Sequence, residues 1–269
     1  MNKSYLMVAG DKQKHLDKLD KLLCDIAIVN LEDGVFDKNY ARELVYNNLL
    51  KRDNSDIVVR INSLDSCGKE DIKLINKIKP KAIRVPKIKT LDDIKIALDL
   101  ICDDIEVHLS IETKEIFNIL TQVKLDPRVS AVYLGILDLL VSLDLPQSIL
   151  NISNSTIDYI LTKFLVDSKI AGVEAISFVY QEYQNLEQFA KWCQKEKDLG
   201  FKAKACISLP QVDIVNKIFA YDLDKITKAK KIVKLFEEHR SKGITGFIHI
   251  KYGFIDEPIY KDALNILGQ

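Results

Sequence analysis

The 269-residue chain has no surplus of charge of either sign, because 39 Lys and Arg residues balance 39 Asp and Glu residues. A protein that binds nucleic acid mainly through phosphate contacts usually carries a basic surplus, so we expect no nucleic-acid partner. The chain also has few of the residues that favour disorder, with six prolines and ten glycines, and 47% of its residues are hydrophobic. This composition indicates a globular protein with a core of its own.

Cysteines are few and long hydrophobic runs are missing. The five cysteines form no CxxC or other metal-like spacing, and we interpret them as buried small side chains in a reducing compartment. No run approaches the roughly 18 apolar residues of a membrane span. The apolar run at the start, within MNKSYLMVAGDK, is too short for a signal peptide. We therefore expect a cytoplasmic protein without membrane contact.

Short apolar runs rich in valine and isoleucine alternate with charged segments of helical period. Apolar side chains on both faces of a short run are typical of strands that are covered on both sides. The predicted strands are residues 5–9, 26–31, 57–61, 82–85, 105–111, 131–134, 173–178 and 203–207. The clearest predicted helices between them are residues 11–23, 39–51, 69–78, 91–101 and 186–197.

Eight strand-helix units predict an α/β fold, a TIM (β/α)8 barrel. A regular spacing supports the barrel, since Arg60, Pro86, Glu112 and Asp138 follow one another at intervals of 26 residues near predicted strand ends. The alternative is a doubly wound open sheet. That fold normally has a glycine-rich first turn, and the turn here contains only Gly10, so the barrel is favoured.

We assign residues 1–221 to the barrel and residues 222–269 to a C-terminal helical extension. The extension contains a predicted helix over residues 225–241, a glycine-punctuated segment over residues 243–253 and a short helix from Pro258. It is too short to be an independent domain, so we expect it to pack on the barrel or on a neighbouring subunit.

Polar residues gather where the predicted strands end, which is where TIM-barrel enzymes hold their active sites. Glu112 and Asp138 follow neighbouring strands, so their carboxylates are expected to converge. Two carboxylates without nearby His or Cys suit a hard cation such as Mg²⁺. The alternative is that both are ordinary first-turn acids that stabilise helix N-termini, and spacing alone leaves this open.

Arg60 interrupts an apolar strand, where a charge is costly unless it is paired. One interpretation is an anion site, because a guanidinium matches a planar carboxylate. The other is a structural ion pair with Glu32 or Asp33, which follow the preceding strand.

Eight motifs occur in an order that resembles the HpcH/HpaI aldolase and citrate lyase β-subunit family, and its CitE-like branch in particular. The resemblance extends from Tyr5 to about Ile266. The motifs are YLMVAGDK, IVNLEDGV, VVRIN, RVPKIKT, SIET, YLGILDLL, GFKAKACIS with Gln211, and YGFIDEP.

The resemblance implies a Mg²⁺-dependent carbon–carbon lyase that is oligomeric, usually a trimer. Its substrates would be acyl-CoA or acyl-carrier thioesters of β-hydroxy acids, such as citryl-, citramalyl- or malyl-thioesters. The products would be an acetyl thioester and a keto acid such as oxaloacetate or pyruvate.

The resemblance also implies roles for individual residues. Arg60 matches the arginine that binds substrate and steadies the enolate oxygen, and Glu112 and Asp138 match the metal ligands. Asp33 matches an acid that holds metal-bound water, and Asp256 matches an acid/base group that reaches a neighbouring subunit's site. These five residues predict a locally acidic mouth. The remaining candidate substrate- or CoA-binding residues are Lys12, Glu32, Asn62 and Lys87.

Several positions depart from the family pattern. Leu137 stands where an acid often precedes the second metal ligand, Ser208 replaces a histidine, and Lys114 replaces a small residue. Such changes predict altered substrate choice or lost activity. Two alternatives therefore stay open: a CitE-like paralogue that acts as a binding or assembly subunit, and a 2-keto acid aldolase.

Overall fold

The structure is a computed structural model and describes residues 3–220 and 222–268. Within these residues eight parallel strands pair in sequence order, and β8 pairs with β1 to close the barrel. The TIM-barrel prediction is confirmed, and the open sheet is excluded. The strands are β1 (Ser4–Ala9), β2 (Ile26–Asn30), β3 (Ile57–Arg60), β4 (Ala82–Val85), β5 (Glu106–Ile111), β6 (Val129–Leu134), β7 (Glu174–Ser177) and β8 (Ala203–Cys206).

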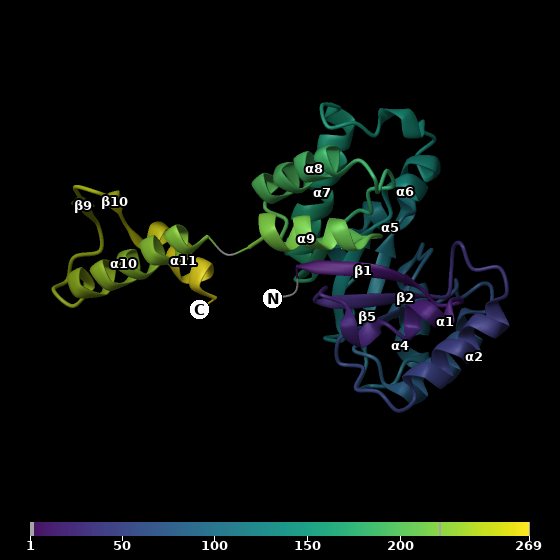
Figure 1. The fold of residues 1–269 in the computed structure, drawn as a ribbon. Helices are drawn as coiled ribbons and strands as arrows, with labels where there is room; N and C mark the ends of the chain where they lie inside the picture. The colour runs from purple at the N-terminus through teal and green to yellow at the C-terminus, as the bar shows by residue number, and fades with distance from the viewer. Residues whose placement is uncertain (1–2, 221, 269) are drawn as a thin grey trace. The chain divides into compact units, whose positions relative to one another are not determined.

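Helices surround the strands of the barrel (Figure 1). They are α1 (Gln13–Leu16), α2 (Lys38–Leu49), α3 (Gly68–Ile75), α4 (Leu91–Leu100), α5 (Lys114–Asn118), α6 (Ile136–Ser142), α7 (Ser155–Ala171), α8 (Leu186–Leu199) and α9 (Leu209–Ile218). Short 3-10 turns are η1 (Leu19–Lys21), η2 (Asn76–Ile78), η3 (Leu120–Gln122) and η4 (Gln147–Ile149). No helix in the described ranges is both long and apolar enough to cross a membrane.

The first predicted helix, over residues 11–23, is wrong as a continuous element. The segment forms only α1 and η1, each of which buries one leucine, Leu16 and Leu19. The Lys12 side chain, at the N-cap, makes no capping hydrogen bond. A short, uncapped helix with little buried surface gains too little to extend further.

Two apolar layers hold the barrel together, one between strands and helices and one inside the barrel. Side chains alternate between these layers along each strand. On β3, Val58 packs inside the barrel while Val59 packs against the helices. Arg60, two residues after Val58, therefore faces the interior. The interior layer comprises Tyr5, Ile26, Ile28, Val58, Ala82, Ala131, Tyr133, Ile176, Ala203 and Ala205.

The chain divides into two compact units, residues 1–219 and residues 220–269. The second unit consists of α10 (Leu223–Arg240), a hairpin of β9 (Phe247–His249) and β10 (Gly253–Ile255), and α11 (Glu257–Leu267). It has a small core of its own, built around Phe236 and Ile255. The packing of this extension on the barrel or on a neighbouring subunit stays a prediction.

All five cysteines are free thiols. Cys193 and Cys206 are buried, as expected of small hydrophobic side chains. The same expectation is wrong for Cys102, which is exposed. Cys102 lies in the turn that leads from α4 to β5, where the backbone reaches the surface.

Candidate active site

A cavity of about 340 Å³ lies at the carboxyl ends of the barrel strands. Its lining comes from all eight strands or the loops that follow them. The structure thus brings together four of the predicted site residues, Asp33, Arg60, Glu112 and Asp138. The other lining residues are Met7, Asn30, Gly34, Arg84, Leu134, Gly135, Ile136, Leu137, Val179, Gln181 and Ile207.

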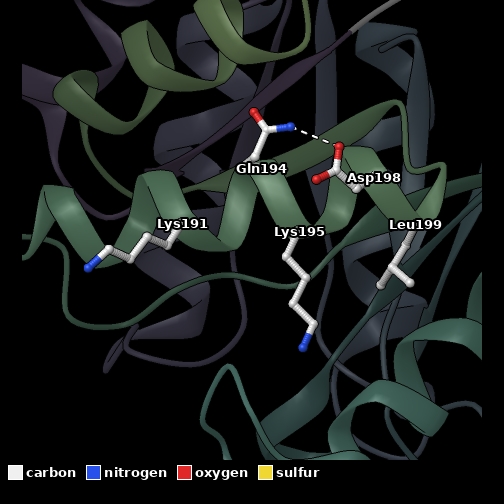
Figure 2. A pocket seen from close by; sticks show the side chains of 5 residues that line it. All are labelled: Lys191, Gln194, Lys195, Asp198 and Leu199. Carbon is white, nitrogen blue, oxygen red and sulfur yellow. Dashed lines mark hydrogen bonds between the residues drawn. The ribbon is translucent and has the colours of Figure 1, made fainter.

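A larger hollow of about 470 Å³ runs along α8 (Figure 2). Its lining side chains all come from this one helix, and Gln194 donates a hydrogen bond of 2.8 Å to Asp198 within the helix. Lys191 and Lys195 point away from that pair in Figure 2. Lys195 is already paired with Asp158, and none of the predicted site residues lines this hollow, so the cavity at the strand ends is the candidate active site.

Glu112 directly follows β5 and is 2% exposed. The backbone N–H of Lys87 donates a hydrogen bond of 2.6 Å to its Oε1 atom. Lys87 adopts a left-handed conformation with φ +56°, which costs about 1 kcal/mol for a residue with a side chain. Burial raises the pKa of Glu112, although Arg60 and Arg84 oppose the shift. This buried carboxylate would gain from a bound cation.

Asp138 is an exposed residue in the first turn of α6 and lines the same cavity as Glu112. It lies close enough to Glu112 for its charge to contribute to the raised pKa of that acid. Among the described residues, none donates a hydrogen bond to or forms an ion pair with the Asp138 carboxylate. The predicted position at a strand end needs correction, because β6 ends four residues earlier, at Leu134.

The donor set fits a hard cation. Glu112 and Asp138 supply carboxylate oxygens, and in the described ranges no group of three or more His, Cys, Asp or Glu residues forms a closed metal cage. Mg²⁺ is usually bound by one or two carboxylates and completes its shell with water and substrate oxygens. Asp33 makes an ion pair with Arg60 instead of joining the two acids, so its predicted role through water stays a prediction.

Arg60 is the last residue of β3 and is 8% exposed. Its Nη2 atom lies 2.5 Å from Oε2 of Glu32 and 3.1 Å from Oδ2 of Asp33. Lys87 holds the other oxygen of Glu32, with its Nζ 2.9 Å from Oε1. The structural ion pair that the sequence left open is therefore present. Yet Nε of Arg60 is buried without a hydrogen-bond partner, and all the contacts above are made by Nη2, so the guanidinium keeps donors for a ligand in the cavity.

Five of the predicted site residues do not line the cavity. Two of them are Glu32, which pairs with Arg60, and Lys87, which pairs with Glu32. The other three are Asn62, Lys12 and Asp256. The side-chain amide of Asn62 donates a hydrogen bond of 2.7 Å to the fully buried Asp71, which fixes α3 against the end of β3. Lys12 is exposed and pairs with its neighbour Asp11 at 2.8 Å. Asp256 belongs to the second unit, where its carboxylate caps α11 by accepting a hydrogen bond from the backbone N–H of Ile259.

Two residues that shape the cavity, Arg84 and Gly135, were not predicted from the sequence. Arg84, on β4, is 5% exposed and interrupts an apolar strand just as Arg60 does, so the same signal was available. Gly135 stands directly after β6. A Cβ atom there would lie 2.6 Å from Cβ of Glu112 and 2.8 Å from its Oε2, so only glycine leaves room for this carboxylate.

The three departures from the family pattern lie in different surroundings. Leu137 is half-buried and lines the cavity. Lys114 is exposed in the first turn of α5 and does not line the cavity. Ser208 is the N-cap residue of α9, and its hydroxyl is buried without a partner. Only Leu137 is therefore placed to contact a ligand directly.

Fold and site together define a class, a TIM-barrel protein whose cavity presents two carboxylates beside buried guanidinium groups. The model of the HpcH/HpaI aldolase/citrate lyase family matches residues 3–208. The chain belongs to this family, which confirms the resemblance noted in the sequence and the expected class of enzyme, a carbon–carbon lyase.

Curated relatives align over nearly the whole chain. A (3S)-malyl-CoA thioesterase of Cereibacter sphaeroides is 26% identical over 90% of this chain and 85% of the relative. The mitochondrial citramalyl-CoA lyase of Rattus norvegicus is 26% identical over 98% and 85%. The citrate lyase subunit beta of Leuconostoc mesenteroides subsp. cremoris is 25% identical over 99% and 92%.

A solved structure shares the fold. The protein CitE from Mycobacterium tuberculosis, in complex with magnesium, acetoacetate and coenzyme A, has a TM-score of 0.80 and 18% sequence identity. The match covers 99% of this chain and 97% of that protein.

Proposed function

We propose that the protein is a Mg²⁺-dependent lyase that cleaves a β-hydroxyacyl thioester of the citryl-, citramalyl- or malyl-CoA type into a keto acid and an acetyl thioester. The observation that carries the proposal is the convergence of Glu112, Asp138 and Arg60 on one cavity. The names of the curated relatives support the substrate class, since all three act on or form part of enzymes for such acids.

The reaction needs negative charge to be stabilised at two places. The substrate hydroxyl gives its proton to a base, the acid/base role that the family resemblance assigns to Asp256. The bond between the α and β carbons then breaks, the hydroxyl oxygen becomes the keto oxygen, and the electron pair of the broken bond moves into an enolate of the acetyl thioester. Bound Mg²⁺ would supply a Lewis acid for the oxygen that becomes the keto group. Arg60 lines the cavity and keeps guanidinium donors without a hydrogen-bond partner, which would stabilise the enolate oxygen.

The surrounding residues position these groups. Glu112 and Asp138 would hold the cation. The backbone N–H of Lys87 and the missing side chain at Gly135 fix the carboxylate of Glu112. Glu32 holds the Arg60 guanidinium in place through the 2.5 Å contact at Nη2. Preorganised groups of this kind need no rearrangement as charge develops.

The last step returns a proton to the enolate carbon. We assign this step to Asp256 from the C-terminal unit of a neighbouring subunit in a trimer, by resemblance to the family. Lys12 remains the candidate contact for CoA phosphate, as an exposed cation outside the cavity.

The proposal is tested by incubating the purified protein and Mg²⁺ with citryl-CoA, citramalyl-CoA and malyl-CoA and measuring acetyl-CoA release. We expect turnover of at least one thioester, and Arg60→Ala should lower kcat by about 10²-fold or more, as for a lost oxyanion donor. Arg52→Ala is the matched control, because Arg52 pairs with Asp20 and Asp56 outside the cavity. Mg²⁺ binding without turnover of any thioester would refute the proposal.

One observation favours a second candidate, a binding or assembly subunit without turnover. The contact between Arg60 and Glu32 already satisfies part of the guanidinium, as a purely structural ion pair would. This candidate predicts that CoA and keto acid bind with no release of acetyl-CoA. It also predicts that Arg60→Ala changes thermal stability but not ligand affinity.

A further inference from the structure

Arg84 and Arg60 are neighbours inside the barrel. The two residues are register partners on the paired strands β3 and β4. The residues beside Arg84, Ile83 and Val85, pack in the outer layer, so Arg84 itself faces the interior. It is 5% exposed and lines the candidate active site together with Arg60. Two guanidinium groups therefore line the cavity from the interior of the barrel.

Arg84 forms no direct ion pair with any described residue, although the charges of Glu112 and Glu32 lie close enough to raise its pKa. Its Nε donates a hydrogen bond of 2.9 Å to Oγ of Ser110, and its guanidinium carbon lies 4.1 Å from the ring centre of Tyr133. Nη1 is buried without any partner. Burial, followed by repulsion from Arg60, lowers the pKa of Arg84 to about 10, so the group remains charged at neutral pH.

Two other cations of the barrel, one fully and one partly buried, show what a purely structural role looks like. Lys204 is fully buried, and its Nζ lies 2.7 Å from Oε1 of Glu196. Arg42 donates a hydrogen bond of 2.6 Å to the buried Asp71. A buried charge is expensive unless it is compensated in this way. Arg84 lacks such a carboxylate and lines a cavity, so its counter-charge is expected from a ligand.

We infer that Arg84 binds a second, distal carboxylate on the keto-acid part of the substrate. This inference rests on the proposed function. There, Glu112 and Asp138 would hold the cation, the cation would bind the keto-acid oxygens beside it, and Arg60 takes the thioester oxygen. The two Nη groups of Arg84, neither of which has a hydrogen-bond partner among the described residues, are the donors that remain. The substrate is then of the citryl type, which yields a dicarboxylic keto acid such as oxaloacetate, and not of the citramalyl or malyl type.

Malate and lactate form a matched pair of probes, because they differ chiefly in the distal carboxylate and both are stable in solution. Isothermal titration calorimetry with each probe, in the presence of Mg²⁺, measures the preference without requiring turnover. We expect the wild-type protein to bind malate about 10–100-fold more tightly than lactate, the effect of one hydrogen bond to a charged group. Arg84→Met should remove most of this preference while lactate affinity changes little.

Two further variants separate recognition from folding. Arg84→Lys keeps the charge but loses the planar fork, so an intermediate preference is expected. Arg128→Met is the control: Arg128 precedes β6 and donates to the backbone carbonyls of Leu98 and Ile101 outside the cavity. The Arg128→Met variant should prefer malate over lactate to the same degree as the wild type. If Arg84→Met does not fold, the wild-type preference and Arg84→Lys decide the question.

The outcomes distinguish the two proposals. Equal binding of malate and lactate by the wild type, or an unchanged preference in Arg84→Lys and Arg84→Met, overturns the inference and leaves the lyase proposal standing. Failure of the folded wild type to bind either acid with Mg²⁺ overturns both. A higher rate of acetyl-CoA release from citryl-CoA than from citramalyl-CoA, abolished in Arg84→Met, supports both.

Discussion

The Gly135→Ala variant tests how tightly the cavity holds Glu112. The new Cβ would lie 2.6 Å from Cβ of Glu112, and ordinary contact begins at 3.4 Å, so the two residues must separate by about 0.8 Å. Atoms so near the backbone cannot swing aside as the end of a flexible side chain can. Gly135 has φ −86°, which alanine adopts easily, so the effect is steric and not conformational.

The expected cost follows from that displacement. Overpacking a rigid site costs about 1–3 kcal/mol, which lowers Tm by about 2–12 °C for a protein of this size. Moving a catalytic group by about 1 Å typically costs about 10²-fold in rate, so Mg²⁺ affinity and acetyl-CoA release should both fall strongly. The assays are calorimetric Mg²⁺ titration, thermal unfolding and turnover of the thioester panel.

Gly172→Ala is the matched control. Gly172 ends α7 with φ +72°, so alanine there costs about 1 kcal/mol without any contact to the cavity. That variant should lose stability but keep its Mg²⁺ affinity. If Gly135→Ala binds Mg²⁺ and turns over as the wild type does, Gly135 does not position Glu112 and the geometric argument fails.

Three further predictions concern residues around the site. Asn62→Ala should lower Tm by removing a hydrogen bond worth about 1 kcal/mol, with keto-acid affinity unchanged; a selective loss of affinity would instead restore Asn62 as a substrate contact. Lys204→Met or Glu196→Leu alone should destabilise by about 3–5 kcal/mol, and chemical denaturation should show the double variant to be more stable than either, since no charge is left unpaired. The hydrogen bond from His108, above all, holds the pKa of Glu106 below its usual range, so this acid stabilises the fold above its unfolded pKa and the contribution is lost as the pH falls. Glu106→Gln should therefore lower stability near neutral pH and reduce its loss on acidification; parallel pH profiles of Tm in both proteins would contradict this.

The sequence could predict the barrel because local patterns determine it. Each predicted strand is apolar on both faces, and only a parallel sheet covered by helices buries both faces. The regular spacing from Arg60 to Glu112 placed two functional side chains at strand ends, and the structure brings both to the cavity. The same spacing failed for Asp138, which lies four residues beyond the end of β6, so periodicity locates strand ends to within a few residues.

Contacts across the barrel were less predictable. Arg60 and Arg84 give the same local signal, a charge in an apolar strand, yet one pairs with Glu32 and the other pairs with no described acid. Asn62 occupies a strand-end position but is drawn to Asp71, nine residues later. These choices depend on which carboxylates the folded chain brings within reach, and no window of sequence contains that information.

These contacts also change the net charge expected at the mouth of the barrel, which the sequence predicted to be acidic. The four acids Glu32, Asp33, Glu112 and Asp138 face three cations, because Lys87 and Arg84 join Arg60. The cavity region therefore carries one net negative charge, and a divalent cation would convert it to one net positive charge. A site that is positive when loaded with metal favours an anionic ligand.

The positions of the charged side chains in the cavity determine where the charges of a bound ligand must lie. Glu112 and Asp138 would hold the metal, whereas Nη1 of Arg84 and Nε of Arg60 lack partners in the interior part of the cavity. A monocarboxylic keto acid satisfies only the metal end and leaves Arg84 uncompensated. A dicarboxylic acid neutralises both ends, which is the physical reason to expect a citryl-type thioester as the substrate.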